Sequence, residues 1–216
     1  MEYIQYFIDF VLHIDKHLQD FTATYGTLTY VLLFLIIFCE TGLVVCPFLP
    51  GDSLIFAAGA LAGAGLLNPI LLFVIIFIAA VIGDTVNYHI GKNFGHIIIR
   101  KNWVKQAHLD KTHDFFEKHG GKTIVYARFV PIVRTLAPFV AGISKMNYTY
   151  FIRYNFFGGF LWTIIFVLLG YFFGTMDFVQ KNFSLVIIAI IVISLLPPFI
   201  SYLYERFSGK TKKNNT

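Results

Sequence analysis

Four ionisable side chains lie inside apolar parts of this sequence. Glu40 precedes, and Asp52 ends, the motif PFLPGD at 47–52, which interrupts the first long apolar stretch. Arg128 and Arg134 lie six residues apart, on either side of Pro131, in a second interrupted stretch. A charged residue at the centre of a spanning helix costs about 2.5 to 3.5 kcal/mol on insertion scales, so residues of this kind usually have a function.

These residue types indicate two complementary kinds of chemistry. An arginine stays charged and presents a planar fork of donors that matches phosphate oxygens, so Arg128 and Arg134 can converge on one anion. A carboxyl group in a low-dielectric environment can be poised to exchange protons, which predicts a proton-coupling role for Glu40 and Asp52. The alternative is a structural ion-pair cluster that locks two segments together.

The composition predicts an integral membrane protein. Of the 216 residues, 57% are hydrophobic and only 13% are charged, which departs strongly from a soluble domain. The net charge of +5 is typical of loops that face anionic lipid, and no array of aromatic and basic residues indicates nucleic-acid binding. The sequence shows no nucleophile–base set or phosphate-binding glycine loop, so we expect neither an enzyme nor a cofactor.

The chain divides into an N-terminal amphipathic segment and five apolar stretches. In residues 1–27, apolar side chains recur at helical spacing opposite polar ones, which predicts a helix at the membrane interface. A soluble helix packed on a loop is the alternative. The apolar stretches are 28–65, 69–90, 123–144, 150–174 and 183–204.

Lysines and arginines predict which parts face the cytoplasm. They are concentrated in the 91–122 loop and in the C-terminal tail, so both should be cytoplasmic. The two share a side only if the 123–144 stretch re-enters the membrane, because a single crossing would leave the tail outside. The 28–65 stretch then opens to the outside, as a re-entrant hairpin or as two full spans.

The two halves of the chain repeat one order, in which a proline-broken stretch and small residues precede a span. We therefore predict an all-α membrane protein, an inverted repeat of two Pro-broken re-entrant helical hairpins plus spanning helices. The carboxylates of one hairpin and the arginines of the other would meet near the bilayer centre.

Other polar residues offer weaker candidates for a site. Asp84, Asn87 and Tyr88 are possible secondary members of a substrate path, and a polar cluster at the cytoplasmic end of a helix is the alternative. His108 and His113 lie in a charged loop, where a solvated surface is favoured over a metal site, and no metal is expected. The aromatic residues of 151–162 either line a lipid groove or, as is slightly favoured, face lipid.

Several motifs together resemble the DedA family of membrane proteins, also called the SNARE-associated or VTT-domain family. They are Glu40, PFLPGD, GDTVNYHIGKNFG at 83–95, FFEKHGGK at 115–122 and ARFVPIVRTLAPFVAG at 127–142. The resemblance covers about 28–175, the predicted transport domain, which 176–216 follows as a last span and a basic tail. It implies that Glu40 and Asp52 are the family's essential acids, and Arg128 and Arg134 its essential arginines. It also implies a multi-pass protein of the bacterial cytoplasmic membrane.

The same resemblance implies a function, since bacterial members are implicated in returning undecaprenyl phosphate to the cytoplasmic leaflet and in membrane homeostasis that depends on proton motive force. We therefore predict a flippase that moves a lipid phosphate, here undecaprenyl phosphate or another anionic lipid, from the outer to the inner leaflet with protons. The alternatives are a proton-coupled small-ion or cation antiporter, a phospholipid scramblase and a scaffold held by ion pairs. The sequence leaves open the coupling ion and whether the chain forms a homo-oligomer.

The predicted topology can be tested by labelling single cysteines introduced at Lys118, Lys212 and Asp177, after Cys39 and Cys46 have been replaced. A membrane-impermeant maleimide should label position 177 from outside the cell, and positions 118 and 212 only after the membrane is opened. Labelling of position 212 from outside would contradict the re-entrant topology.

Overall fold

The computed structural model describes residues 14–43, 51–100, 120–182, 185–186 and 188–189. All regular secondary structure in these ranges is helical, which confirms the predicted all-α class. Five predicted features lie wholly or largely outside the described residues: the start of the N-terminal helix, Pro47–Pro50 of the first break, the histidines of the central loop, most of the 183–204 stretch and the basic tail.

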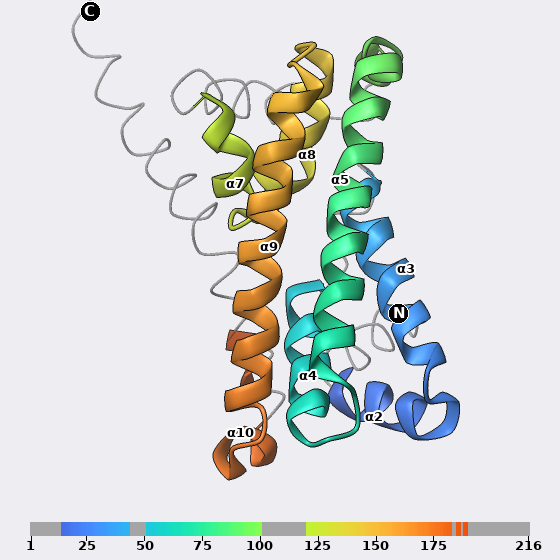
Figure 1. Cartoon of the computed structure of the whole chain (residues 1–216), viewed down its shortest axis with the longest axis vertical. Helices are drawn as coiled ribbons and strands as arrows, with labels where there is room; N and C mark the ends of the chain where they lie inside the picture. The colour runs from blue at the N-terminus through green and yellow to red at the C-terminus, as the bar shows by residue number, and fades with distance from the viewer. Residues whose placement is uncertain (1–13, 44–50, 101–119, 183–184, 187, 190–216) are drawn as a thin grey trace, which may run out of the picture.

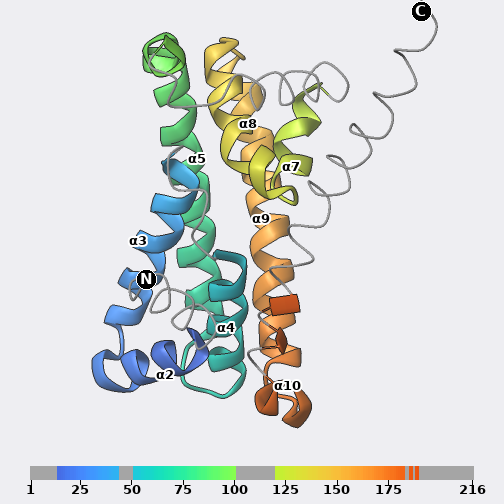
Figure 2. The same cartoon turned by 180° about the vertical axis from the view of Figure 1, so that it is seen from behind.

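Two long apolar helices, α5 (Pro69–Arg100) and α9 (Tyr148–Phe173), pack against each other along the molecule (Figures 1 and 2). Each is long and apolar enough to cross a membrane, and only 33% of the most apolar part of each helix is buried inside the protein. A core helix of a soluble protein would bury far more of its apolar surface. The outward apolar faces of α5 and α9 are therefore suited to lipid.

Helix α5 runs ten residues beyond the predicted end of its span near Ile90. Gly91 and Gly95 lie inside the helix and face α8 (Pro131–Ile143). A Cβ at Gly91 would overlap the backbone carbonyl of Phe139. These glycines serve close helix packing, as small residues do in membrane proteins, and do not end the helix.

Shorter helices precede each long helix. Helices α3 (Leu28–Gly42) and α4 (Gly51–Gly63) come before α5, whereas η1 (Gly120–Lys122), α7 (Thr123–Ala127) and α8 (Pro131–Ile143) come before α9. The second interruption has a clear local cause. Pro131 occupies the first turn of α8, and the preceding Val130 is extended, as a residue before proline prefers to be.

The two halves exchange partners. Helix α3 packs on α5 of its own half and α7 on α9 of its own half, but α4 packs on α9 and α8 packs on α5. Figures 1 and 2 show α4 near one end of the molecule, and α7 and α8 near the other. Each half thus packs the helix that follows its break, α4 or α8, on the long helix of the other half.

Backbone-to-backbone contacts hold the exchanged helices together. A Cβ at Gly59 of α4 would lie only 2.6 Å from the Val167 carbonyl of α9 and 3.0 Å from Gly170 Cα. In the other half, a Cβ at Gly142 of α8 would overlap the Tyr88 carbonyl of α5. The small-residue segments that follow the two breaks therefore let α4 and α8 approach the long helices closely.

Short helices lie at the end of the molecule where α4 ends. Helix α2 (Ile14–Tyr25) packs on α3 and α4 there, roughly transverse to the long helices, and α10 (Asp177–Lys181) follows α9 (Figure 1). In α2, Leu18 and Thr22 are buried while most of the other described side chains are exposed. The described part of the N-terminal segment is thus helical, with one buried stripe.

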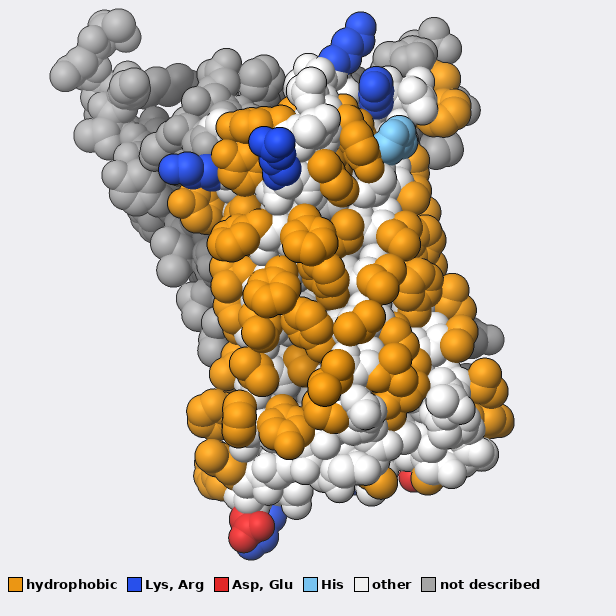
Figure 3. All heavy atoms as spheres, in the orientation of Figure 1, with side chains coloured by type: hydrophobic (Ala, Val, Ile, Leu, Met, Phe, Trp, Pro, Cys, Tyr) orange, Lys and Arg blue, Asp and Glu red, His pale blue; other side chains and the backbone are white. Residues whose placement is uncertain are grey.

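Hydrophobic side chains cover the face formed by α5 and α9, with charged side chains at its ends (Figure 3). Of the described residues, four exposed basic side chains belong to the end formed by α7, α8 and the C-terminal part of α5: Lys92, Lys122, Lys145 and Arg153. The opposite end has the exposed Lys16 and Lys181. An apolar band between two charged edges is typical of a protein embedded in a membrane.

Candidate functional site

Arg134 of α8 is the centre of a charged cluster about midway along the two long helices. Its Nη1 donates to Asp52 Oδ1 at 3.0 Å and lies 3.6 Å from Glu40 Oε1. Its guanidinium carbon lies 4.1 Å from the centroid of the Trp162 ring, a favourable cation–π contact. Trp162 Nε1 also donates to Asp52 Oδ1 at 3.0 Å. One guanidinium group therefore joins α8 to α3, α4 and α9.

Arg128 forms a second cluster between α5 and α9. Its Nη2 donates to Asp84 Oδ2 at 2.5 Å and to Asn155 Oδ1 at 2.6 Å. Asn155 Nδ2 in turn donates to the Val81 carbonyl at 3.0 Å. The Arg128 and Asp84 side chains are only 2% and 4% exposed, so removal of either one leaves the other buried without its nearest counter-charge.

Asn87 of α5 connects the two interrupted segments through its side-chain amide. Its Nδ2 donates to the Thr41 carbonyl, at the end of α3, at 3.1 Å and to the Thr135 carbonyl of α8 at 2.8 Å. Tyr88, the next residue, donates its hydroxyl to the Met146 carbonyl beyond α8. Asn87 and Tyr88 thus fix the interrupted helices against α5.

Local backbone features allow the acids to reach the arginines. Gly51 lies directly against the Glu40 carboxylate, and any Cβ at this position would overlap it. Asp52 lies in the first turn of α4, where the helix dipole favours a negative side chain. The second half of PFLPGD therefore supplies space for one acid and a favourable position for the other.

Each arginine uses only part of its donor capacity. In the described part of the chain, Arg128 Nε and Nη1, Arg134 Nε and Nη2, and Glu40 Oε2 are buried without a hydrogen-bond partner. A buried polar group without a partner costs about 1 to 3 kcal/mol. Both guanidinium groups therefore retain donors that the oxygens of an anion can satisfy.

The charges of the two clusters do not balance. Glu40, Asp52 and Asp84 supply three carboxyl groups, whereas Arg128 and Arg134 supply two guanidinium groups. If all five are ionised, the site has one excess negative charge. Any further anion that enters must be accompanied by a proton or a cation, because uncompensated charge is costly in a low-dielectric interior.

The structure brings together the residues that the sequence pointed to, but in a different arrangement. Glu40, Asp52 and Arg134 meet as expected, whereas Arg128 pairs with Asp84 instead of joining Arg134 on one group. The alternative that Asp84 belongs to a polar cluster at the end of a helix is wrong, because Asp84 lies in the middle of the longer helix α5.

Sequence reasoning missed Asn155 and Trp162 as members of the site. They lie in the aromatic 151–162 segment, where Phe156, Phe157 and Phe160 face outward and Asn155 and Trp162 are fully buried. The only useful signal was Asn155 itself, since an amide in an apolar helix needs hydrogen-bond partners. Within the described ranges, no group of three or more His, Cys, Asp and Glu side chains is placed to hold a metal ion.

Comparisons with known proteins agree with the membrane-like surface. Residues 49–172 match the VTT domain. The chain is 52% identical to protein DedA of Escherichia coli strain K12, over 99% of the chain and 100% of that protein. It is 41% identical to an uncharacterized membrane protein of Mycobacterium leprae, over 77% of the chain and 76% of the relative. The inner membrane protein YqjA of Escherichia coli strain K12 is 37% identical over 67% of each chain. No solved structure matches the chain.

The buried pair of Arg128 and Asp84 gives a stability prediction. Asp84→Asn should lower the free energy of unfolding in detergent by about 3 to 5 kcal/mol, because Arg128 then lacks its counter-charge. The double variant Asp84→Asn/Arg128→Gln should recover most of this loss. Arg153→Gln, on the exposed surface of α9, is the matched control and should change little. Strictly additive losses in the double variant would contradict the coupling.

Proposed function

The chain belongs to the VTT-domain, or DedA, family of membrane proteins, and from this membership we propose that it is a flippase for a lipid phosphate. The proposed substrate is undecaprenyl phosphate, and the proposed direction is from the outer to the inner leaflet of the bacterial cytoplasmic membrane. Proton motive force is the proposed driving force. Arg128 and Arg134 would bind the phosphate, and Glu40 and Asp52 would handle the protons.

The observation that carries this proposal is the spare donor capacity of the two arginines. Both are at least 94% buried, and each leaves two nitrogen groups without partners in the described structure. A purely structural pair gains most when its donors are all satisfied. A phosphate offers several acceptor oxygens and matches the guanidinium fork, so it can use donors that the carboxylates leave unused.

Charge balance supports coupling to protons. A phosphate at the arginines would compete with carboxylates in a site that already has one excess negative charge. Protonation of Glu40 or Asp52 relieves this competition and frees Arg134 for the phosphate, and loss of that proton drives the phosphate out again. Asp52 is the more accessible acid, with a side chain 20% exposed against 8% for Glu40.

The exchange of helices between the halves supports an alternating-access cycle. We propose that α3 with α4, and α7 with α8, are re-entrant hairpins that open to opposite sides of the membrane. The exposed basic residues near α7 and α8 support a cytoplasmic location for that end. Charged groups in the middle would then be reached from one side at a time, as in transporters built from inverted repeats.

A proton-coupled cation antiporter is the second candidate, and the excess carboxyl group favours it. Glu40 Oε2 is buried without a partner among the described residues and has the charge to attract a cation. A phospholipid scramblase would need the lipid path but no proton coupling. Transport of lipid phosphate without a dependence on proton motive force would therefore favour the scramblase, and cation flux without lipid transport the antiporter.

Four single variants separate a carrier from a scaffold. Arg128→Lys and Arg134→Lys keep the charge but lose the planar fork, so each should lose lipid-phosphate binding and transport in proteoliposomes. Glu40→Gln and Asp52→Asn should still bind the lipid but lose the response of transport to a pH gradient. Arg153→Lys is the matched control and should behave like the wild type.

The scaffold alternative predicts a different result for the same four variants. Folded protein yield would then fall in all of them together, because each leaves a buried charge poorly paired. Wild-type transport by the two Arg→Lys variants would contradict the proposed phosphate site.

A further inference from the structure

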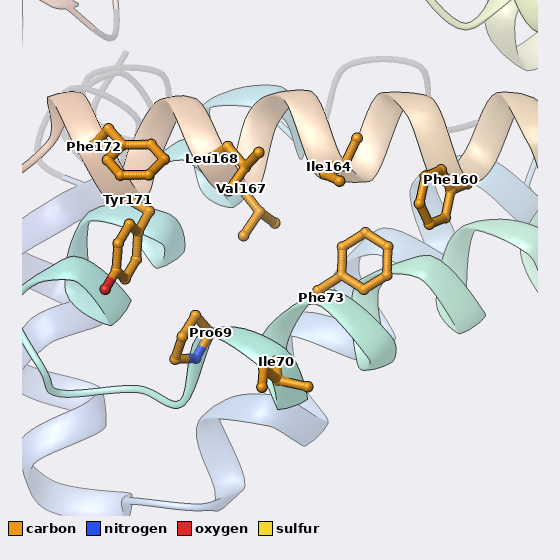
Figure 4. A pocket seen from close by; sticks show the side chains of 9 residues that line it. All are labelled: Pro69, Ile70, Phe73, Phe160, Ile164, Val167, Leu168, Tyr171 and Phe172. Atoms are coloured by element: carbon orange, nitrogen blue, oxygen red, sulfur yellow. The ribbon is translucent and has the colours of Figure 1, made fainter.

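A lateral apolar groove runs between α5 and α9 in the half of the molecule that contains α4 and α10. Its volume is about 400 Å³, within the roughly 300 to 1,000 Å³ usual for ligand sites. Pro69, Ile70 and Phe73 of α5 form one wall, and residues of α9 from Phe160 to Phe172 form the other (Figure 4). In Figure 4, Phe73 and Phe160 lie close together at one end, and Pro69 and Tyr171 face each other near the opposite end.

The shape and lining of the groove favour a hydrocarbon chain. All of its lining side chains are apolar or aromatic, and Val167 in its wall is buried while Ile70 and Phe172 at its rim are largely exposed. From Phe160 to Phe172 the groove follows twelve helical steps, about 18 Å at 1.5 Å per residue. A long apolar groove that is open to lipid has no charged group in its lining that could bind an inorganic ion.

One end of the groove adjoins the charged site. Phe73, Phe77, Phe156 and Phe160 form edge-to-face contacts between α5 and α9, with ring centroids 4.8 to 6.2 Å apart. Next to Phe160, Gly159 lies under the Arg128 guanidinium, since a Cβ there would be 3.4 Å from Arg128 Nη2. The groove and the Arg128 cluster are therefore separated by this aromatic contact and one glycine.

We propose that this groove binds the hydrocarbon chain of the lipid whose phosphate is held by the arginines, with the chain directed away from Arg128 toward Tyr171. This proposal rests on the proposed function and deepens it, because it makes the chain, as well as the phosphate, a determinant of substrate choice. In the predicted topology the groove lies in the outer half of the membrane. The lipid is therefore loaded from the outer leaflet.

Two groove-filling variants and a neighbouring control test the proposal. Ile70→Trp and Leu168→Trp place a large side chain in the groove, whereas Leu71→Trp alters an exposed residue of α5 outside its lining. Binding of undecaprenyl phosphate, undecaprenol and the short-chain butyl phosphate is measured with purified protein in nanodiscs. We expect the two groove variants to bind undecaprenyl phosphate at least about tenfold more weakly because chain contacts are lost. Leu71→Trp should bind as the wild type does, and butyl phosphate binding should not change in any variant.

The other outcomes contradict the chain site, the proposed function or both. Wild-type affinity of both groove variants for undecaprenyl phosphate, or an equal loss in Leu71→Trp, overturns the chain site and leaves the proposed function standing. Groove-dependent binding of undecaprenol without any binding of the two phosphates keeps the chain site and overturns the proposed phosphate carrier. Absence of binding by all three compounds overturns both the chain site and the proposed phosphate carrier. A change of oligomeric state in the groove variants, measured by light scattering, assigns the groove to a contact between subunits and overturns the chain site.

Discussion

A guanidinium group can lie inside an apolar helix bundle only if carboxylates lie beside it, and the architecture of this protein meets that condition twice. Arg134 lies within reach of Asp52 and Glu40, and Arg128 within reach of Asp84. The acids come from a different half of the chain than the arginines. The interrupted helices must therefore meet in the middle of the molecule, and glycines such as Gly51 provide the space for the contact.

The two clusters differ in ways that fit different tasks. Arg128, Asp84 and Asn155 are all nearly inaccessible and tie α7 to the two long helices. Arg134 shares its nearest acid with Trp162, and that acid is partly exposed. We therefore propose proton exchange for the Arg134 cluster, whereas the Arg128 cluster lies next to the groove proposed for the lipid chain. A phosphate held between them would link both tasks.

The sequence predicted much of this arrangement because charged residues are rare in apolar membrane segments and prolines break their helices, so both stand out where they occur. Prolines and charges in apolar stretches marked both interruptions, and Arg134, Asp52 and Glu40 meet as expected. The pairing of Arg128 with Asp84 was not predicted, since sequence spacing within α5 does not show which arginine faces which acid. The length of α5 was also underestimated, because the apolar stretch ends near Ile90 whereas the helix continues to Arg100, with Gly91 in a packing contact with α8. Trp162 was missed because its aromatic neighbours face outward.

We propose that a phosphate and the carboxylates compete for the same arginines, so that phosphate binding is coupled to protons. Calorimetry of undecaprenyl phosphate binding in buffers of different ionisation enthalpy measures the protons exchanged on binding. We predict net proton uptake by the wild type and a clear reduction of that uptake in Glu40→Gln or Asp52→Asn. Binding of the lipid phosphate with no proton exchange at any pH would contradict it.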